Sequence, residues 1–191
     1  MEQKKKSWFR RHWIISIILV FVIIGTIGSL FDNEEAQNSN KESSSIKKEP
    51  MDLLPTREEI DSEWENIKIN NQDIDASGFD SGASLEMDRM ESLSLSLAYI
   101  FVYKFDSKNY ADSFYSAEIN KVKERGGYTE ISTSGIDAIC FGYKGGDLYE
   151  GYYYSFYCKK DNIFFQTEVA TFSAWRSGYS KELAKIVADK I

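Results

Sequence analysis

The sequence predicts an α+β protein in which a single N-terminal transmembrane helix precedes an antiparallel sheet of about five to six strands, with two main helices packed on one face. Three observations predict this arrangement. Residues 14–31 carry no charged side chain and follow a basic segment. Residues 93–105 place apolar side chains at every second position, as a half-buried strand does. Further apolar segments, separated by turn residues, then lead to a C-terminal helical pattern, which a meander with helices on one side accommodates.

The segment 14–31 has the length and flanks of an uncleaved membrane anchor. A helix rising about 1.5 Å per residue needs roughly twenty apolar residues to cross a bilayer. A buried core helix would show a recurring polar face, and a cleaved signal peptide would be shorter and end in small residues, which 26–28 match only in part. Because basic residues stay inside, residues 1–13 form a cytoplasmic tail. We therefore expect a single-pass protein of the cell membrane, with its C-terminal part outside the cytoplasm.

The rest of the chain divides into a linker and one domain. Residues 32–55 are rich in Ser, Asn, Glu and Lys, which predicts a disordered linker. Residues 56–191 are long enough for one extracytoplasmic α+β domain with its own core. The charge is +4 over residues 1–31 and −3 over 32–55, so the whole-chain charge of −7 leaves −8 for the domain. An acidic domain repels phosphate backbones, and nucleic acid is not a predicted partner.

Local signals define the first half of the domain. Thr56 and Glu59 have the spacing of a capping box, which predicts that a helix begins there. Ser107 can cap a second helix, and Gly126-Gly127 can end it. The expected elements are a short helix over 56–62, a strand over 64–69, a loop over 70–82, a strand over 93–105 and a helix over 107–125.

The sequence of the second half of the domain predicts strands that are separated by turns and followed by a C-terminal helix. Gly145-Gly146 and Asp161-Asn162 are typical turn residues. From Tyr179 to Ile191, apolar residues recur at intervals of four, three, one and four, which gives one apolar helix face. The expected strands cover 128–132, 136–143, 149–159 and 163–171.

Several of these segments together resemble uncharacterised archaeal membrane-anchored proteins. The likeness spans most of the domain, and its motifs are structural. It implies an exported protein and assigns no catalytic or binding residue. The segments that carry it are Leu53-Leu54-Pro55-Thr56-Arg57, Glu63-Trp64, Val102-Tyr103-Lys104-Phe105-Asp106-Ser107 and Gly126-Gly127-Tyr128-Thr129-Glu130.

Cys140 and Cys158 are the only cysteines, and an even count in an exported domain favours a disulfide. If Gly145-Gly146 is a two-residue hairpin turn, Cys140 faces Gly151 and cannot reach Cys158. If the loop is longer and centred near Tyr149, the two cysteines lie opposite each other. A bridge requires Cα atoms within about 7 Å, so the bond would report the second register. We expect the bridge, with buried free thiols as the alternative.

One loop has a partial metal-binding pattern. Residues 73–78 match the first six positions of a calcium loop, with Asp73, Asp75 and Ser77 as oxygen ligands and Gly78 at the sharp turn. The match fails at position twelve, where Ser84 replaces the bidentate Glu. Asp, Ser and Gly also form ordinary turns. Calcium is the one cofactor that the sequence suggests.

An aromatic cluster is the candidate surface for a protein or glycan partner. On a strand, Tyr152 and Tyr154 share one face, while Tyr153 and Tyr157 share the other. One face is expected to pack on helices, and the other can offer flat rings to a sugar, peptide or protein. The alternative is that aromatic residues are simply favoured in strands.

The sequence offers little for catalysis. His12, the only histidine, lies in the predicted cytoplasmic tail, so the domain has no imidazole for a triad, zinc site or proton shuttle. We therefore predict a membrane-anchored extracytoplasmic module that binds or assembles. The alternative is a histidine-free hydrolase that uses Asp or Glu, although Glu58, Glu59, Asp61 and Glu63 are more typical of a solvated helix face.

Overall fold

The computed structural model describes residues 45–91, 94–147, 151–171 and 178–191. They belong to one compact unit, Ser43–Ile191, which contains its own hydrophobic core. The predicted cytoplasmic tail, the predicted anchor 14–31 and most of the predicted linker lie outside the described residues. Within the described ranges, no helix combines the length and apolar character needed to cross a membrane.

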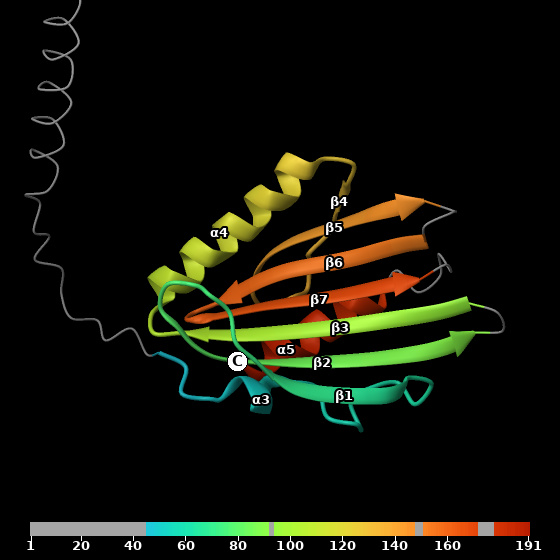
Figure 1. Cartoon of the computed structure of the whole chain (residues 1–191), viewed down its shortest axis with the longest axis horizontal. Helices are drawn as coiled ribbons and strands as arrows, with labels where there is room; N and C mark the ends of the chain where they lie inside the picture. The colour runs from blue at the N-terminus through green and yellow to red at the C-terminus, as the bar shows by residue number, and fades with distance from the viewer. Residues whose placement is uncertain (1–44, 92–93, 148–150, 172–177) are drawn as a thin grey trace, which may run out of the picture. The chain divides into compact units, whose positions relative to one another are not determined.

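The unit is built on a seven-stranded sheet in which every neighbouring pair is antiparallel (Figure 1). The strand order is β1-β2-β3-β7-β6-β5-β4, so two meanders meet where β3 pairs with β7. The antiparallel α+β prediction is confirmed. The strands are β1 (Glu65–Gln72), β2 (Phe79–Glu91), β3 (Ser94–Phe105), β4 (Thr129–Ile131), β5 (Ile139–Asp147), β6 (Gly151–Lys160) and β7 (Ile163–Thr171).

The predicted count of five to six strands is wrong, because residues 79–91, which overlap the predicted loop over 70–82, form the additional strand β2. Leu85 and Met87 of β2 are buried, while Glu86 between them and Asp88 after them are only partly covered. This is the alternation of a half-buried strand. Small and acidic residues have low strand propensity, and they hide the period of two.

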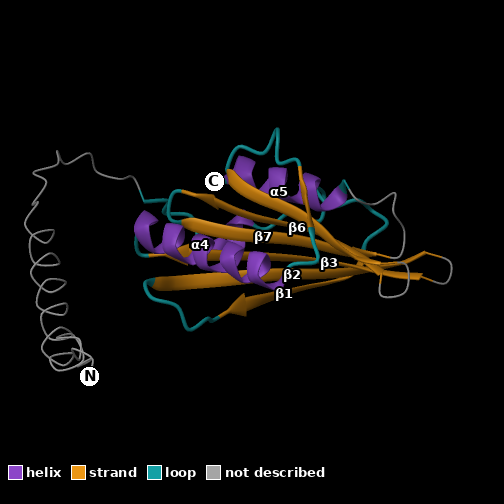
Figure 2. Cartoon of the chain, turned by 90° about the horizontal axis from the view of Figure 1, so that it is seen from above, coloured by secondary structure: helices purple, strands orange, loops and turns teal. Residues whose placement is uncertain are grey.

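Three described helices accompany the sheet: α3 (Pro50–Leu53), α4 (Lys108–Arg125) and α5 (Tyr179–Lys190). The prediction that the two main helices share one face is wrong. Leu183 and Val187 of α5 pack with Phe165 on one face of the sheet, while Ala111 and Phe114 of α4 belong to a separate core on the other. Figures 1 and 2 show α4 and α5 on opposite sides of the strands.

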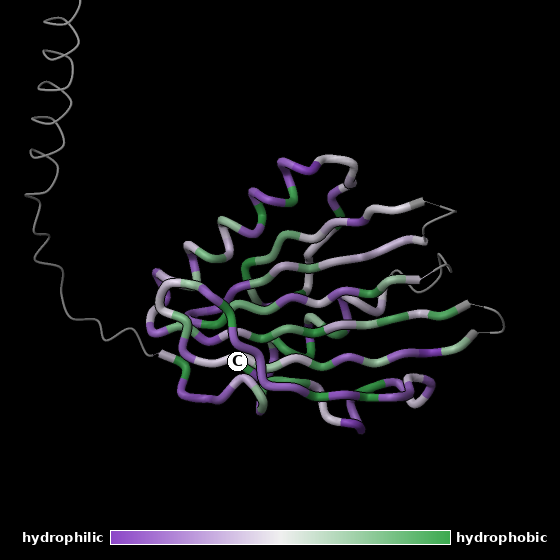
Figure 3. Tube along the Cα trace, in the orientation of Figure 1, coloured by the Kyte–Doolittle hydropathy of each residue, from purple (hydrophilic) through white to green (hydrophobic). Residues whose placement is uncertain are grey.

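The reason for two covered faces lies in the inner strands. Phe164 and Phe165 are adjacent in β7, point to opposite faces and are both almost fully buried. Phe156 and Tyr157 do the same in β6. Figure 3 shows hydrophobic colour along β3, whereas α4 and β1 carry long hydrophilic stretches. We call the two sides the α4 face and the α5 face.

The folded unit begins earlier than the predicted boundary at Thr56. Leu53 and Leu54 are buried in the core beneath the α5 face. The Ile46 N–H donates to Asn162 Oδ1 at 2.8 Å, and Lys104 pairs with Glu49 at 2.9 Å. The linker prediction is therefore wrong for residues 46–55, because two adjacent leucines provide enough apolar surface to dock the segment.

The predicted helix over 56–62 is a series of turns. Half of the expected capping arrangement is nevertheless present, since the Thr56 N–H donates to Glu59 Oε2 at 2.7 Å. The Glu59 N–H donates to the Thr56 carbonyl at 3.1 Å, which closes a single turn. The helix predictions over 107–125 and from Tyr179 are confirmed by α4 and α5.

Candidate functional site

Helix α4 covers only one end of its sheet face. Phe114 lies with its ring centroid 5.8 Å from Tyr103, 5.2 Å from Phe105 and 5.0 Å from Phe164, at the end of the sheet where β3 leads into α4. Toward the other end of the strands, Met90 is 68% exposed and Leu95 43% exposed. This part of the sheet is not covered by any described residue, and we call it the open face.

Strand register defines which side chains belong to the open face. Met90 faces Leu95, Glu86 faces Tyr99, and Tyr99 in turn faces Glu168. All lie on the side of the sheet that carries α4, because side chains alternate along each strand. The open face consists of Glu86, Asp88, Met90, Leu95, Leu97, Tyr99, Phe101, Tyr153, Gln166, Glu168 and Ala170.

An apolar strip runs along β3 through this surface. Leu95, Leu97, Tyr99 and Phe101 occupy successive same-face positions, and the last three are half-buried. The Tyr99 and Phe101 rings are nearly parallel, with centroids 6.5 Å apart. Phe101 lies 6.3 Å from Tyr103, so the strip is continuous with the core beneath α4. Monomeric proteins rarely expose a large contiguous apolar patch without an interaction at that site.

The strip ends in a shallow depression of about 250 Å³. Leu95 and Leu97 form one wall of it, and Tyr152 and Tyr153 form another. The depression is smaller than the roughly 300–1,000 Å³ that is typical of small-molecule pockets. The end of the sheet is therefore better shaped for a side chain than for a whole small ligand.

Carboxylates flank the aromatic strip. Glu86 and Glu168 are the cross-strand neighbours of Tyr99 on its two sides. Burial, together with the charges of these two carboxylates, raises the pKa of the Tyr99 hydroxyl. The Ser155 hydroxyl donates to Glu168 Oε2 at 2.7 Å, and the Asn66 amide donates to Asp88 at 2.9 Å. The open face thus combines exposed apolar surface with negative charge.

The four tyrosines predicted as a partner surface divide into two groups. Tyr154 and Tyr157 are buried. The Tyr143 hydroxyl donates to Tyr157 at 3.3 Å, and burial raises the pKa of Tyr157 far above the ordinary tyrosine value. Tyr152 and Tyr153 are half-buried beside the depression. The packing interpretation therefore holds for two of the four, and the other two border the open face.

Sequence reasoning located β3 but not its role at this surface. The period of two in 93–105 identifies one apolar phase of the strand, but it does not indicate how much of that phase a helix covers. The signal that was available is the length of the strand. Residues 95–105 span about 33 Å at roughly 3.3 Å per residue, and α4 crosses only part of this length.

Cys140 and Cys158 form a disulfide with Cα atoms 4.1 Å apart, as predicted. They are directly opposed in the β5–β6 pair, and Asp147 pairs with Gly151 at the end of the same ladder. The register centred near residue 149 is therefore correct, while Gly145-Gly146 lies within β5 rather than forming the turn.

The predicted calcium loop connects β1 and β2. Ile74 and Ala76 pack against the core of the α4 face, so Asp73, Asp75 and Ser77 alternate with inward-facing apolar residues. Across the part of the chain that the structure describes, no group of three or more His, Cys, Asp or Glu side chains is arranged to hold a metal ion. Calcium at this loop remains a prediction from the sequence.

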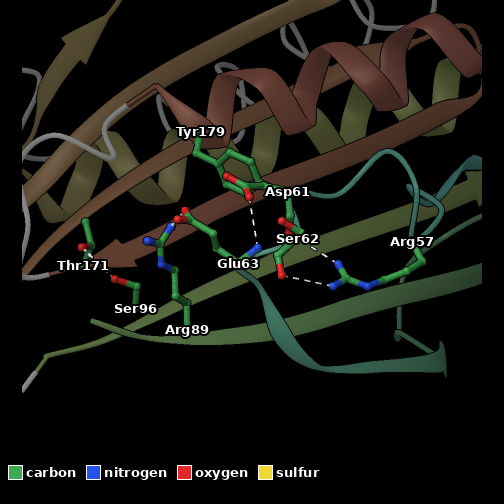
Figure 4. Close-up of polar contacts among 8 residues, drawn as sticks. All are labelled: Arg57, Asp61, Ser62, Glu63, Arg89, Ser96, Thr171 and Tyr179. Carbon is green, nitrogen blue, oxygen red and sulfur yellow. Dashed lines mark hydrogen bonds and ion pairs between the residues drawn. The ribbon is translucent and has the colours of Figure 1, made fainter. Parts of the chain in front are cut away.

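The acidic residues near Glu59 make structural contacts on the α5 face. Burial alone would raise the pKa of Glu59, but hydrogen bonds and the charge of Lys190 outweigh it and lower the pKa. Glu63 pairs with Arg89 of β2. The Asp61 N–H donates to the Tyr179 hydroxyl at 3.3 Å. Figure 4 shows the last two of these contacts, which hold the turns after Thr56 against β2 and the start of α5.

No protein-family model matches the chain, and no curated protein sequence matches it. Among solved structures, the chain is similar to the extracellular domain of PknH from Mycobacterium tuberculosis. The sequence identity is 11%, the TM-score is 0.51, and the aligned region covers 73% of this chain and 94% of that chain. At this identity the likeness concerns the fold alone.

Proposed function

We propose that this protein is a membrane-anchored extracytoplasmic module that binds or assembles with a protein or glycan partner through the open face. The carrying observation is the partly exposed strip of Leu95, Leu97, Tyr99 and Phe101, which extends from the core to the uncovered end of the sheet. Aromatic and aliphatic side chains in contiguous patches are the usual centres of protein interfaces.

Two observations support a location outside the cytoplasm. The Cys140–Cys158 disulfide fits an oxidising compartment. One solved structure with a similar fold, that of PknH, is an extracellular domain. Residues 14–31 would supply the anchor, as the resemblance to archaeal membrane-anchored proteins also implies.

The hydrolase alternative would require two carboxylates that face each other across a cleft. Glu86 and Glu168 instead flank an aromatic ring on an open sheet surface. Glu59 and Glu63 are engaged with basic side chains. No arrangement within the described ranges specifically favours hydrolysis over binding.

Site-specific photo-crosslinking in the full-length membrane protein tests the proposal. A photoreactive residue at Leu95 is expected to capture a partner, and the same residue at Ile139 is the matched control, because both positions are exposed apolar strand residues. Treating intact cells with a membrane-impermeant reagent tests the orientation. Equal capture from both positions, or none from Leu95, would overturn the assignment of the open face.

A further inference from the structure

The open face carries more negative than positive charge. Glu86, Asp88 and Glu168 lie on it. Burial, and to a smaller extent the charge of Glu118 of α4, raises the pKa of the Tyr103 hydroxyl. Lys121 pairs with Glu118 at 2.5 Å, and Lys68 is the cross-strand neighbour of Glu86. Among the described residues, Glu168 forms no ion pair, and its hydrogen-bond donor is the neutral Ser155 hydroxyl. A cationic group would therefore be favoured beside Glu168.

The aromatic rings favour a cation at the same place. Tyr99 lies between Glu86 and Glu168 in one row across the sheet. A cation placed over the Tyr99 ring would interact with the ring face and with two carboxylates at once. The aliphatic part of a lysine or arginine side chain could then cover Leu97.

The shape of the strip favours an extended chain as the occupant. Leu95, Leu97, Tyr99 and Phe101 are spaced about 6.6 Å apart along β3, which equals the spacing of alternate side chains in an extended peptide. A second copy of this acidic domain and an anionic lipid surface would both be repelled.

We propose, on the basis of the proposed function, that the open face recognises an extended basic segment of a partner protein, with a lysine or arginine side chain placed over Tyr99 and paired with Glu168. Apolar side chains of the same segment would contact the strip and the depression beside Tyr153.

The test uses the compact unit, residues 43–191, which contains the whole described core. The probe is a synthetic hexapeptide of alternating lysine and leucine, compared with hexapeptides in which glutamine or glutamate replaces lysine. Binding is measured by calorimetry at low and high salt. We expect the lysine peptide to bind most tightly and to weaken as salt increases.

Glu168→Gln is the diagnostic variant, because it removes the charge and retains an oxygen that can accept from Ser155. We expect it to weaken binding of the lysine peptide about tenfold, as loss of one charged contact predicts. Glu58→Gln, at an exposed carboxylate in the turns after Thr56, is the matched control and should leave binding unchanged. Thermal unfolding of both variants verifies that they fold as the parent does.

The outcomes separate this inference from the proposed function. If all three peptides bind equally, and Leu95→Ser weakens them while Glu168→Gln does not, the charge selection is wrong and the binding face stands. Absence of binding by the lysine peptide also overturns the inference. Binding of a neutral oligosaccharide in preference to the lysine peptide would do the same. Failure of photo-crosslinking at Leu95 instead counts against the proposed function itself.

Discussion

Removing the Cys140–Cys158 disulfide should destabilise the folded unit by about 3 kcal/mol. The bond closes a loop between residues separated by 18 positions, and the chain-entropy relation gives about 3 kcal/mol for a loop of this length. The bond joins β5 and β6, two paired strands of the second meander, so its loss widens the unfolded ensemble while leaving the native ladder in place. For a unit of this size, the corresponding decrease in Tm is about 6–12 °C.

Urea unfolding of residues 43–191 measures this effect, with circular dichroism as the signal. The oxidised unit is compared with the same unit in reductant and with the Cys140→Ala/Cys158→Ala double variant. Cys158 is fully buried, so the double variant also loses some packing, whereas the reduced unit keeps both sulfur atoms. The reduced unit therefore gives the cleaner value, and the double variant should be at least as unstable.

A loss below about 1 kcal/mol in the reduced unit would refute the loop-closure reasoning. Intact mass before and after alkylation is the necessary control. If both thiols of the untreated unit are alkylated, the bond is absent and the register inferred for β5 and β6 is wrong.

Three further predictions concern the core, the N-terminal segment and an ion pair. Phe165→Ala, at a fully buried position of β7, should lower the free energy of unfolding by about 3–5 kcal/mol. Ile139→Ala, at a 61% exposed position, should change it by less than about 0.5 kcal/mol. Urea unfolding of both variants measures these two differences. Asn162→Ala should lower the free energy of unfolding by about 2 kcal/mol and expose residues 45–54 to protease, because the side-chain amide accepts from the Ile46 N–H and donates to the buried Phe105 carbonyl; unchanged proteolysis would contradict this role. Burial alone would raise the pKa of Asp112, but hydrogen bonds from Lys108 and Lys159 outweigh it and lower the pKa. The ionised carboxylate therefore contributes its full stabilisation of the fold above about pH 3.9, and this stabilisation is lost as pH falls through the lower folded-state pKa. The stability difference between the parent and Asp112→Asn should accordingly shrink on acidification from neutral pH to about pH 2.

The elements with strong local signals could be predicted from the sequence. The bounds of β7 and the start of α5 agree with the predicted ones. The end of α4 is also correct, since Gly126 follows Arg125 with a φ of 65°, a conformation that glycine adopts at little cost. β2 was missed because Gly82, Ala83 and Ser84 weaken its period, and its partners in β1 and β3 supply the stability that the local sequence does not.

The arrangement of the elements depended on contacts distant in the sequence. Nothing in the segment 93–105 indicates that its second neighbour is β7. The buried stripe of α4, which includes Ala111, Ile119 and Val122, does not specify which side of the sheet the helix covers. The candidate site was harder to predict from the sequence for the same reason. Whether Tyr99 is core or surface depends on how far α4 extends across the sheet, and no local pattern contains that information.

The pairing of β3 with β7 also has a consequence for the order of folding. Leu97 and Ala170 are direct partners although they are 73 positions apart in the sequence. During synthesis, β1 to β3 can form a meander by themselves, but β3 remains an unpaired edge until residue 171 has been made. Pairings of such high contact order form slowly. The apolar strip is therefore most prone to aggregation while only the N-terminal half of the domain has been synthesised. Folding is completed only when the last strand, β7, inserts at the centre of the sheet.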